Sequence, residues 1–397
     1  MSKFVELHLI QSVAPSCLNR DDTGSPKDCQ FGGVRRARVS SQSFKRAIRE
    51  SFRTHERLAA SMGVRTKRLV EGTAQRLALR GRDEEIGRKV ARNLLNVVFD
   101  KDMFDGKTTD KTKYLLFLSP SEVQAFGEIA EGFWDELSAM ETQKAETPSG
   151  EEPEEAAPKA SRKGAKTKKT EGSKELLAAV KGLFGKTPGV DLALFGRMIA
   201  DRPDDNIDGV CQVAHAISTH QTAKEVDFFT ALDDLKPDDT SGSDMMGVVE
   251  FNSACLYRYL TLDWDSLVSL LGNEAFARTA LEGFLEAAVR ALPSGRQNSF
   301  AAHNLPSLAF ACVHDGQRFS LVNAFEKPVK PRDGLVEESV RRMDEYLGLL
   351  EKEYGRYLVG TGAVKLHCGP AAGGGLVHLG ERADNLEAWI QAILRAL

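Results

Sequence analysis

The first regular hydrophobic pattern of the chain predicts a β-strand over residues 4–10. Apolar and polar side chains alternate there, and a period of two is typical of a strand with one face toward a core. The apolar face would carry Val5, Leu7 and Leu9, and the opposite face Glu6 and His8. We expect His8 to face solvent or a ligand, because the sequence places no acid or nucleophile beside it that would make it a catalyst.

The next pattern predicts a helix that comes just after residues 39–43. Phe44, Ile48 and Phe52 recur at steps of four, as in the buried stripe of a helix. A second face carries Lys45, Arg49 and Arg53. The serine-rich run at 40–43 can cap the first turn, whose free N–H groups also suit a phosphate. The shared cationic face and the helix start therefore indicate contact with a sugar-phosphate backbone.

The rest of the chain reads as further strands and helices with one interruption. Residues 57–140 look helical, and the later elements are helices at 174–183, 272–291, 337–354 and 386–397 and strands at 190–199, 250–262, 307–313 and 319–322. The acidic stretch 201–250 looks like a long excursion with an inserted helix that holds His215 and His220. This order fits a split βαβ, ferredoxin-like α+β fold with large insertions.

Residues 141–174 interrupt the pattern. They are rich in Glu, Pro, Ala, Lys and Ser and have no aromatic residue. Such a composition buries too little apolar surface to order itself, so we predict a disordered insertion. Its basic second half could touch nucleic acid, but a plain tether is the simpler interpretation.

Charge concentrates where the helix is predicted. The chain of 397 residues has a formal net charge of −4, yet residues 35–53 contain one acid, Glu50, and seven basic residues: Arg35, Arg36, Arg38, Lys45, Arg46, Arg49 and Arg53. A dense basic block in an acidic chain suggests a polyanionic partner. An ordinary solvated basic helix is the alternative.

Composition excludes several classes of protein. The six cysteines are scattered without a CxxC pair, so we expect no zinc site. We also expect no cofactor, and no metal unless the carboxylate alternative given below holds. No run of about eighteen apolar residues occurs, and charges interrupt the apolar N-terminal stretch. We therefore expect no membrane segment, no signal peptide and a cytoplasmic protein.

Two kinds of chemistry remain open. Asp227, Asp233 and Asp234 could bind a metal for phosphodiester cleavage, although a solvated acidic loop is the plainer interpretation. Binding of RNA needs cations for phosphates and apolar side chains for bases. Candidate apolar wedges are Met198, the pair Phe228-Phe229 and the pair Met245-Met246, each of which could instead be core.

Several stretches resemble one protein family. "LNRDDTGSPK" and "FGGVRRARVSSQSFKRAIR" resemble the N-terminal signature of the CasC-type backbone subunit of the type I-E CRISPR Cascade complex, in the RAMP superfamily. The later stretches "KEVDFFTALDDL", "EFNSACLYRY", and "RQNSFAAHN" followed by "NAFEKPV" are similar to the same family and occur in its order. The resemblance spans most of the chain outside residues 140–175.

The resemblance implies an architecture. The family has an RRM-like palm, a helical finger domain and a protruding thumb. By correspondence, the ranges are palm at 1–55, fingers at 56–184 with the disordered insertion 141–174, palm at 185–221, thumb at 222–252, and the rest of the palm at 253–397.

It also implies a function. The family is not catalytic: it polymerises head to tail along a guide RNA with the other Cascade subunits, and its thumbs interrupt the duplex of guide and target DNA. The matching RNA-binding positions are Arg20, Lys27, Ser40, Gln42, Lys45, Arg49, Met198, Phe229 and Met246, and the basic block adds Arg38 and Arg46. Lysine is equally familiar at 49 and leucine at 246. The alternative is a metal-dependent endoribonuclease that uses the thumb acids, as in distant members of the superfamily.

Overall fold

The computed structural model describes residues 2–99, 103–105, 108–140, 172–184, 188–231, 245–331 and 334–397. The chain divides into two compact units. The first, which we call the palm unit, comprises Met1–Ala60, Ala193–Phe195 and Gly209–Leu397. The second, the finger unit, comprises Ser61–Leu192 and Gly196–Asp208. The two units divide residues 188–221 between them, and the assignment of 185–221 to the palm stays a prediction.

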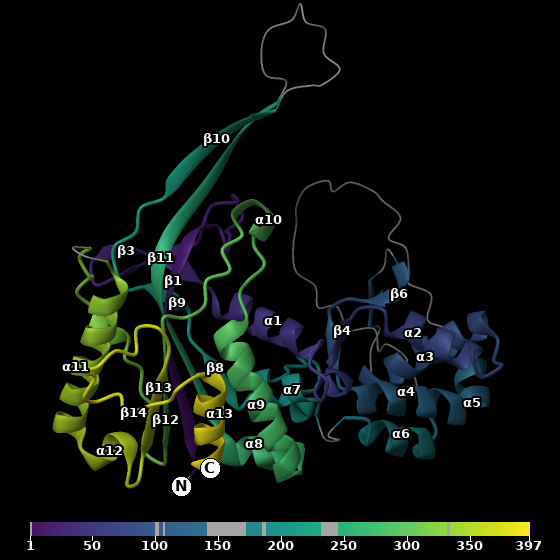
Figure 1. Ribbon diagram of the computed structural model, residues 1–397. Coiled ribbons are helices and arrows are strands. Elements are labelled where there is room, and N and C mark those ends of the chain that lie inside the picture. Colours follow the sequence, from purple (N-terminus) through teal and green to yellow (C-terminus); the bar gives the residue numbers. More distant parts are fainter. Residues whose placement is uncertain are drawn as a thin grey trace, which may run out of the picture. The chain divides into compact units, whose positions relative to one another are not determined.

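A large mixed sheet forms the centre of the palm unit (Figure 1). Its order is β14 (Glu381–Arg382), β13 (Val364–Cys368), β12 (Leu308–His314), β1 (Phe4–Ser16), β11 (Met245–Asp263), β9 (Ala216–Ser218), β3 (Val34–Val39) and β2 (Asp28–Phe31), while β8 (Cys211–Val213) pairs with β11 beside β9. The central strand β1 is antiparallel to both neighbours, with Val5 opposite Leu262 and Val313. The α+β class is confirmed.

Helices cover both faces of this sheet (Figure 1). One face packs on α11 (Val336–Tyr354), in a core that includes Ile10, Phe310 and Met343. On the other side lie α8 (Trp264–Leu271), α9 (Glu274–Arg290) and α13 (Leu386–Arg395). Burial on two faces is the reason why an alternating strand here has no solvent side.

The expectation that His8 faces solvent or a ligand is therefore wrong. Both Glu6 and His8 are 0% exposed. The His8 Nδ1 atom lies 2.8 Å from the Tyr257 hydroxyl, and burial, with a smaller effect of His314, lowers the pKa of His8 to about 3. His8 is a neutral core residue beneath α11.

The expected helix is α1, Ser41–Phe52, which begins within the serine-rich run that was expected to precede it, and its apolar stripe is confirmed. Phe44, Ile48 and Phe52 are each at most 1% exposed. Ser40 is the N-cap, and its Oγ accepts a hydrogen bond from the Ser43 amide at 3.3 Å. Capping and amphipathic spacing thus define this helix locally.

Other elements differ from the sequence-based expectation. Residues 190–199 form no strand: α7 (Val190–Phe195) ends at Gly196, whose φ of 76° closes the helix. Short strands and the 3-10 turn η2 (Pro203–Asp205) occupy the described part of 201–231, so His215 and His220 follow strands β8 and β9. Instead of a strand at 319–322, a 3-10 turn, η3 (Val322–Phe325), begins there. The four-residue helices α10 (Gln297–Phe300) and α12 (Arg356–Val359) were not expected.

The described part of the finger unit is mainly helical, with two short strand pairs, β4 with β7 and β5 with β6. Its elements are η1 (Ala59–Ser61) at the junction, β4 (Val64–Thr66), α2 (Leu69–Ala78), α3 (Glu84–Phe99), β5 (Phe104–Asp105), β6 (Thr108–Thr112), β7 (Leu116–Leu118), α4 (Pro120–Gly132), α5 (Trp134–Ala139) and α6 (Lys174–Lys181). A buried ion pair joins Arg197 to Glu122 at 2.7 Å, with both side chains 1% exposed.

Most of the expected insertion, 141–171, lies outside the described residues. The last residues of the expected insertion form the start of α6. Ser173 caps this helix by accepting a hydrogen bond from the Leu176 amide at 3.1 Å, and the Ser173 hydroxyl donates to Glu136 at 2.8 Å. In the described part of the chain, every helix is too short or too polar to cross a bilayer.

Gly32 permits the close contact between the β2–β3 turn and the segment after η3. It has a φ of +59°, and a Cβ there would lie 1.8 Å from the Glu326 carbonyl oxygen. We expect Gly32→Ala to lower the free energy of unfolding by more than about 3 kcal/mol, since strain and overlap add. Gly33→Ala is the control: its φ is +76° but no atom lies within 4 Å of the added Cβ. Its cost should be about 1 kcal/mol. Equal urea unfolding curves for the two variants would contradict the contact.

Candidate nucleic-acid interface

The loop before β2 is tied to the start of α1. The Asn19 side-chain oxygen accepts a hydrogen bond from the Ser40 amide at 2.9 Å. The Asn19 carbonyl accepts from the Lys27 amide, also at 2.9 Å, and Arg20 forms an isolated bridge with Pro26. Strand β2 then pairs with β3, which leads directly into α1. This short-range network brings Arg20, Lys27 and the helix start together.

The first turn of α1 is already capped by protein groups. Besides the Ser40 cap, the Ser41 amide donates to His215 Nδ1 at 3.2 Å. Burial, followed by the charges of Arg38 and Lys27, lowers the pKa of His215. A neutral imidazole can accept the hydrogen bond, so His215 stabilises the helix start. Sequence reasoning missed this residue because it assigned His215 to a helix.

Five cations of the basic region are available to a ligand. Arg20 and Arg46 are exposed, and Lys27, Arg38 and Lys45 are partly exposed. Arg38 Nε donates to the Asp28 carbonyl at 3.1 Å, and Lys45 Nζ lies 5.7 Å from the centre of the Phe195 ring. Within the described ranges, none of the five forms an ion pair with a carboxylate. Unpaired cations on neighbouring elements create the positive potential that a phosphate backbone requires.

Two other arginines of the basic block are buried. Arg36 is 0% exposed and donates to four backbone carbonyls: Phe31 at 3.1 Å, Ser218 at 3.1 Å, Phe325 at 2.7 Å and Glu326 at 3.2 Å. Burial lowers its pKa. Arg49 is 6% exposed. The common cationic face of Lys45, Arg49 and Arg53 thus includes one buried side chain, and Arg36 connects β3 to the "NAFEKPV" stretch.

The expected thumb is a two-stranded hairpin that projects from the sheet (Figure 1). Strand β10 (Glu225–Ala231) pairs with the first part of β11, with Phe229 opposite Gly247 and Thr230 opposite Met246. Because directly opposed residues share a face, Phe229 and Met246 lie on opposite faces of the hairpin.

Both faces of the hairpin are apolar and accessible. Phe228, Met246 and Val248 are 60%, 67% and 60% exposed on one face. On the other face, Phe229 is 39% exposed, because its ring lies over Gly247: a Cβ at Gly247 would be 2.3 Å from Phe229 Cζ. An exposed apolar surface of this kind indicates a binding site.

The remaining predicted residues lie at the start of α1, in the finger unit and in the hairpin. Ser40 is buried as the helix cap, and Gln42 is exposed in the first turn of α1. Met198 lies in the finger unit, 82% exposed, next to the buried Arg197. Asp227 is exposed in β10, while Asp233 and Asp234 lie outside the described residues. The described residues include no group of three or more His, Cys, Asp or Glu arranged to hold a metal ion.

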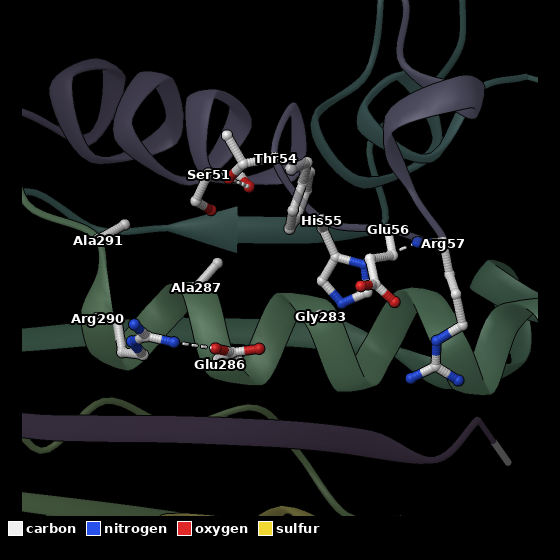
Figure 2. A pocket seen from close by; sticks show the side chains of 11 residues that line it. Ser51, Thr54, His55, Glu56, Arg57, Gly283, Glu286, Ala287, Arg290 and Ala291 are labelled. Carbon is white, nitrogen blue, oxygen red and sulfur yellow. Dashed lines mark hydrogen bonds and ion pairs between the residues drawn. The ribbon is translucent and has the colours of Figure 1, made fainter.

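A cavity of about 550 Å³ lies between the end of α1 and α9 (Figure 2). Ser51, Thr54 and His55 line one side, and Glu286 and Arg290 the other. Arg290 is ion-paired with Glu286, and nearby Arg57 pairs with Glu282 at 2.7 Å. Because its cations are neutralised by carboxylates, this cavity lacks the unpaired positive charge of the first part of α1.

Comparisons with known proteins agree with this description. The chain matches the family model of CT1975-like proteins, Cas_CT1975, over residues 5–392 and belongs to this family. One solved chain, from a pre-nicking CRISPR RNA-guided surveillance complex, is 31% identical with a TM-score of 0.82, and the match covers 99% of each chain. Another, from a CRISPR RNA-guided surveillance complex, is 26% identical with a TM-score of 0.72, covering 99% of this chain and 100% of the other. Curated protein sequences give no significant match. The resemblance to the Cascade backbone subunit is confirmed.

Proposed function

We propose that this chain is a non-catalytic backbone subunit that binds CRISPR guide RNA in a cytoplasmic Cascade complex. The observation that carries the proposal is the group of unpaired cations around the start of α1, Arg20, Lys27, Arg38, Lys45 and Arg46, in a chain similar to subunits of RNA-guided surveillance complexes. Such cations neutralise phosphates without reading sequence, which suits a protein that must hold any guide.

The proposal includes polymerisation along the guide, with copies head to tail beside other Cascade subunits. A cationic surface and a projecting apolar hairpin are different surfaces of one chain. Contacts between different surfaces generate open assemblies instead of closed pairs. The hairpin is apolar on both faces, so it is suited to insertion between bases and to interrupting the pairing of guide with target DNA.

The test is co-expression with a repeat-containing RNA. We expect the purified protein to carry nucleic acid absorbance, and the recovered RNA to be the guide, protected over a length that grows with the number of bound subunits. Incubation of this complex with magnesium or manganese should leave the RNA intact. Purification free of RNA would contradict the binding role, and metal-dependent cleavage would favour the ribonuclease alternative.

A further inference from the structure

A second cavity, of about 890 Å³, brings together three arginines from separate segments. Arg20 comes from the loop before β2, Arg46 from α1, and Arg296 from the turn before α10. The first two belong to the candidate interface, but Arg296 lies in the "RQNSFAAHN" stretch, to which no role has been given so far. None of the residues that line this cavity is aromatic. The cavity therefore suits a charged group better than a stacked base.

Two of the three acids that line this cavity, Asp21 and Glu50, are engaged by local groups. Asp21 accepts hydrogen bonds from the Thr23 amide at 3.0 Å, the Thr23 hydroxyl at 2.7 Å and the Ser25 amide at 3.0 Å. The hydrogen bond from the Thr23 hydroxyl is the main cause that lowers the pKa of Asp21. Glu50 pairs with Arg53 at 3.1 Å, and the third acid, Asp22, is exposed.

The three arginines, by contrast, have no carboxylate partner within the part of the chain that the structure describes. The Arg296 Nε atom is in addition buried without a hydrogen-bond partner among those residues. Unpaired guanidinium groups that converge on one cavity are the arrangement that recognises a phosphate.

The backbone that carries Arg296 is held in a strained conformation. Arg296 and Ala301 have φ values of 48° and 46°, and they are the two non-glycine residues with positive φ in the described chain. Gln297 Nε2 donates to the carbonyls of Pro293 and Ala302, both at 3.3 Å. Strain of this kind persists where the surrounding structure fixes it, which is often at a binding site.

Close packing places this turn beside the loop of Arg20. A Cβ at Gly295 would lie 2.4 Å from the Leu18 carbonyl oxygen. The turn therefore fits only against the backbone next to Asn19 and Arg20. The left-handed backbone at Arg296 and the close contact of Gly295 together fix the position of the Arg296 backbone, from which its side chain extends.

We propose that Arg296 binds a phosphate of the guide RNA backbone together with Arg20 and Arg46, so that the turn before α10 is a further element of the RNA interface. The inference rests on the proposed function. It adds a residue that lies far from the basic block in sequence, and it assigns all three arginines to one phosphate.

The test variant is Arg296→Asn, since Asn tolerates left-handed geometry and removes the cation. Affinity for guide RNA is measured over a range of salt concentrations. We expect about tenfold weaker binding and a slope of log affinity against log salt that is smaller by about 0.7, the value for one phosphate of a single strand. Arg290→Gln is the matched control, because Arg290 is ion-paired with Glu286, and it should leave both quantities unchanged.

Arg46→Gln and the double variant Arg46→Gln/Arg296→Asn test whether the phosphate is shared. If the two arginines share one phosphate, the salt slope of the double variant should fall by no more than the value for about one phosphate. Additive losses would overturn the shared site. If Arg296→Asn does not fold, as judged by its thermal unfolding, Arg46→Gln paired with Arg296→Lys measures the same coupling, since Lys keeps the charge and loses the planar fork.

Failure of this inference is distinguishable from failure of the proposed function. If the wild-type protein does not bind guide RNA, the proposed function is wrong. If it binds, and Arg296→Asn has wild-type affinity and slope, only the role of Arg296 is overturned. A loss that appears solely when target DNA is added would assign the phosphate to the target strand and would also overturn the inference.

Discussion

Replacing both Lys27 and Lys45 by Glu is expected to weaken guide RNA binding about 100-fold. Each lysine is partly exposed without a carboxylate partner in the described chain. A hydrogen bond to a charged group contributes about 1.5 kcal/mol or more, and about 1.4 kcal/mol is a factor of ten. The salt slope of binding should also fall by about 1.4, which corresponds to two phosphates of a single strand. Affinity measurements at several salt concentrations, for RNAs of unrelated sequence, check both values.

The matched control is Lys352→Glu with Arg356→Glu, which changes the net charge equally at exposed positions near the end of α11. Its effect on RNA binding should be several-fold smaller, because only long-range potential changes. Equal losses in the two double variants would show that net charge, and not the surface around α1, determines binding. Arg49 is omitted from the test variant because it is 6% exposed, and a buried carboxylate there would unfold the protein instead of reporting on RNA.

The second large effect concerns the thumb hairpin. In the complex assembled with its other subunits, single mismatches between guide and target should be tolerated at regularly spaced positions, where a hairpin displaces a base. A mismatch at such a position should change target affinity less than about twofold, whereas loss of stacking elsewhere costs about 1.4 kcal/mol, or about tenfold. Inserting the hairpin unstacks bases at a cost of a few kcal/mol per site. Contacts between bases and both apolar faces of the hairpin offset this cost.

Phe229→Ala with Met246→Ala should abolish this periodic tolerance. The two side chains lie on opposite faces, so the double variant removes a contact on each side of the inserted hairpin. Tyr357→Ala is the control, because Tyr357 is 73% exposed on the distant helix α12. A mismatch scan of the wild-type complex with uniform sensitivity would refute the thumb mechanism, even if the lysine variants confirm the RNA contacts.

The local sequence was sufficient to predict those helices and strands whose hydrophobic pattern lies within one short segment. The four-residue spacing of Phe44, Ile48 and Phe52 and the serine-rich run before it predicted α1 and its buried face. The aromatic strand at 250–262 and the longer helices after residue 270 were also predicted. The long family motifs identified the family, because several matches in order are specific even where single elements were assigned wrongly.

Tertiary structure decided which side chains are available. Alternation along β1 could not show that helices cover both faces, so His8 was assigned to a surface that does not exist. Charge density could not separate Arg36, bonded to four carbonyls, from the partly exposed Arg38 two residues later. Helical or strand periodicity states which residues share a face, but burial of that face depends on segments far away in sequence.

The same reason explains the residues that sequence reasoning missed. His215 reaches the start of α1 because β9 pairs with β3, and Arg296 lines the same cavity as Arg20 because Gly295 packs on Leu18. The sequence by itself determined that this chain has a cationic helix, an apolar excursion and the motifs of its family. Only the fold decided which cations stay unpaired, and that Phe229 and Met246 face opposite ways, because both follow from strand register and long-range packing.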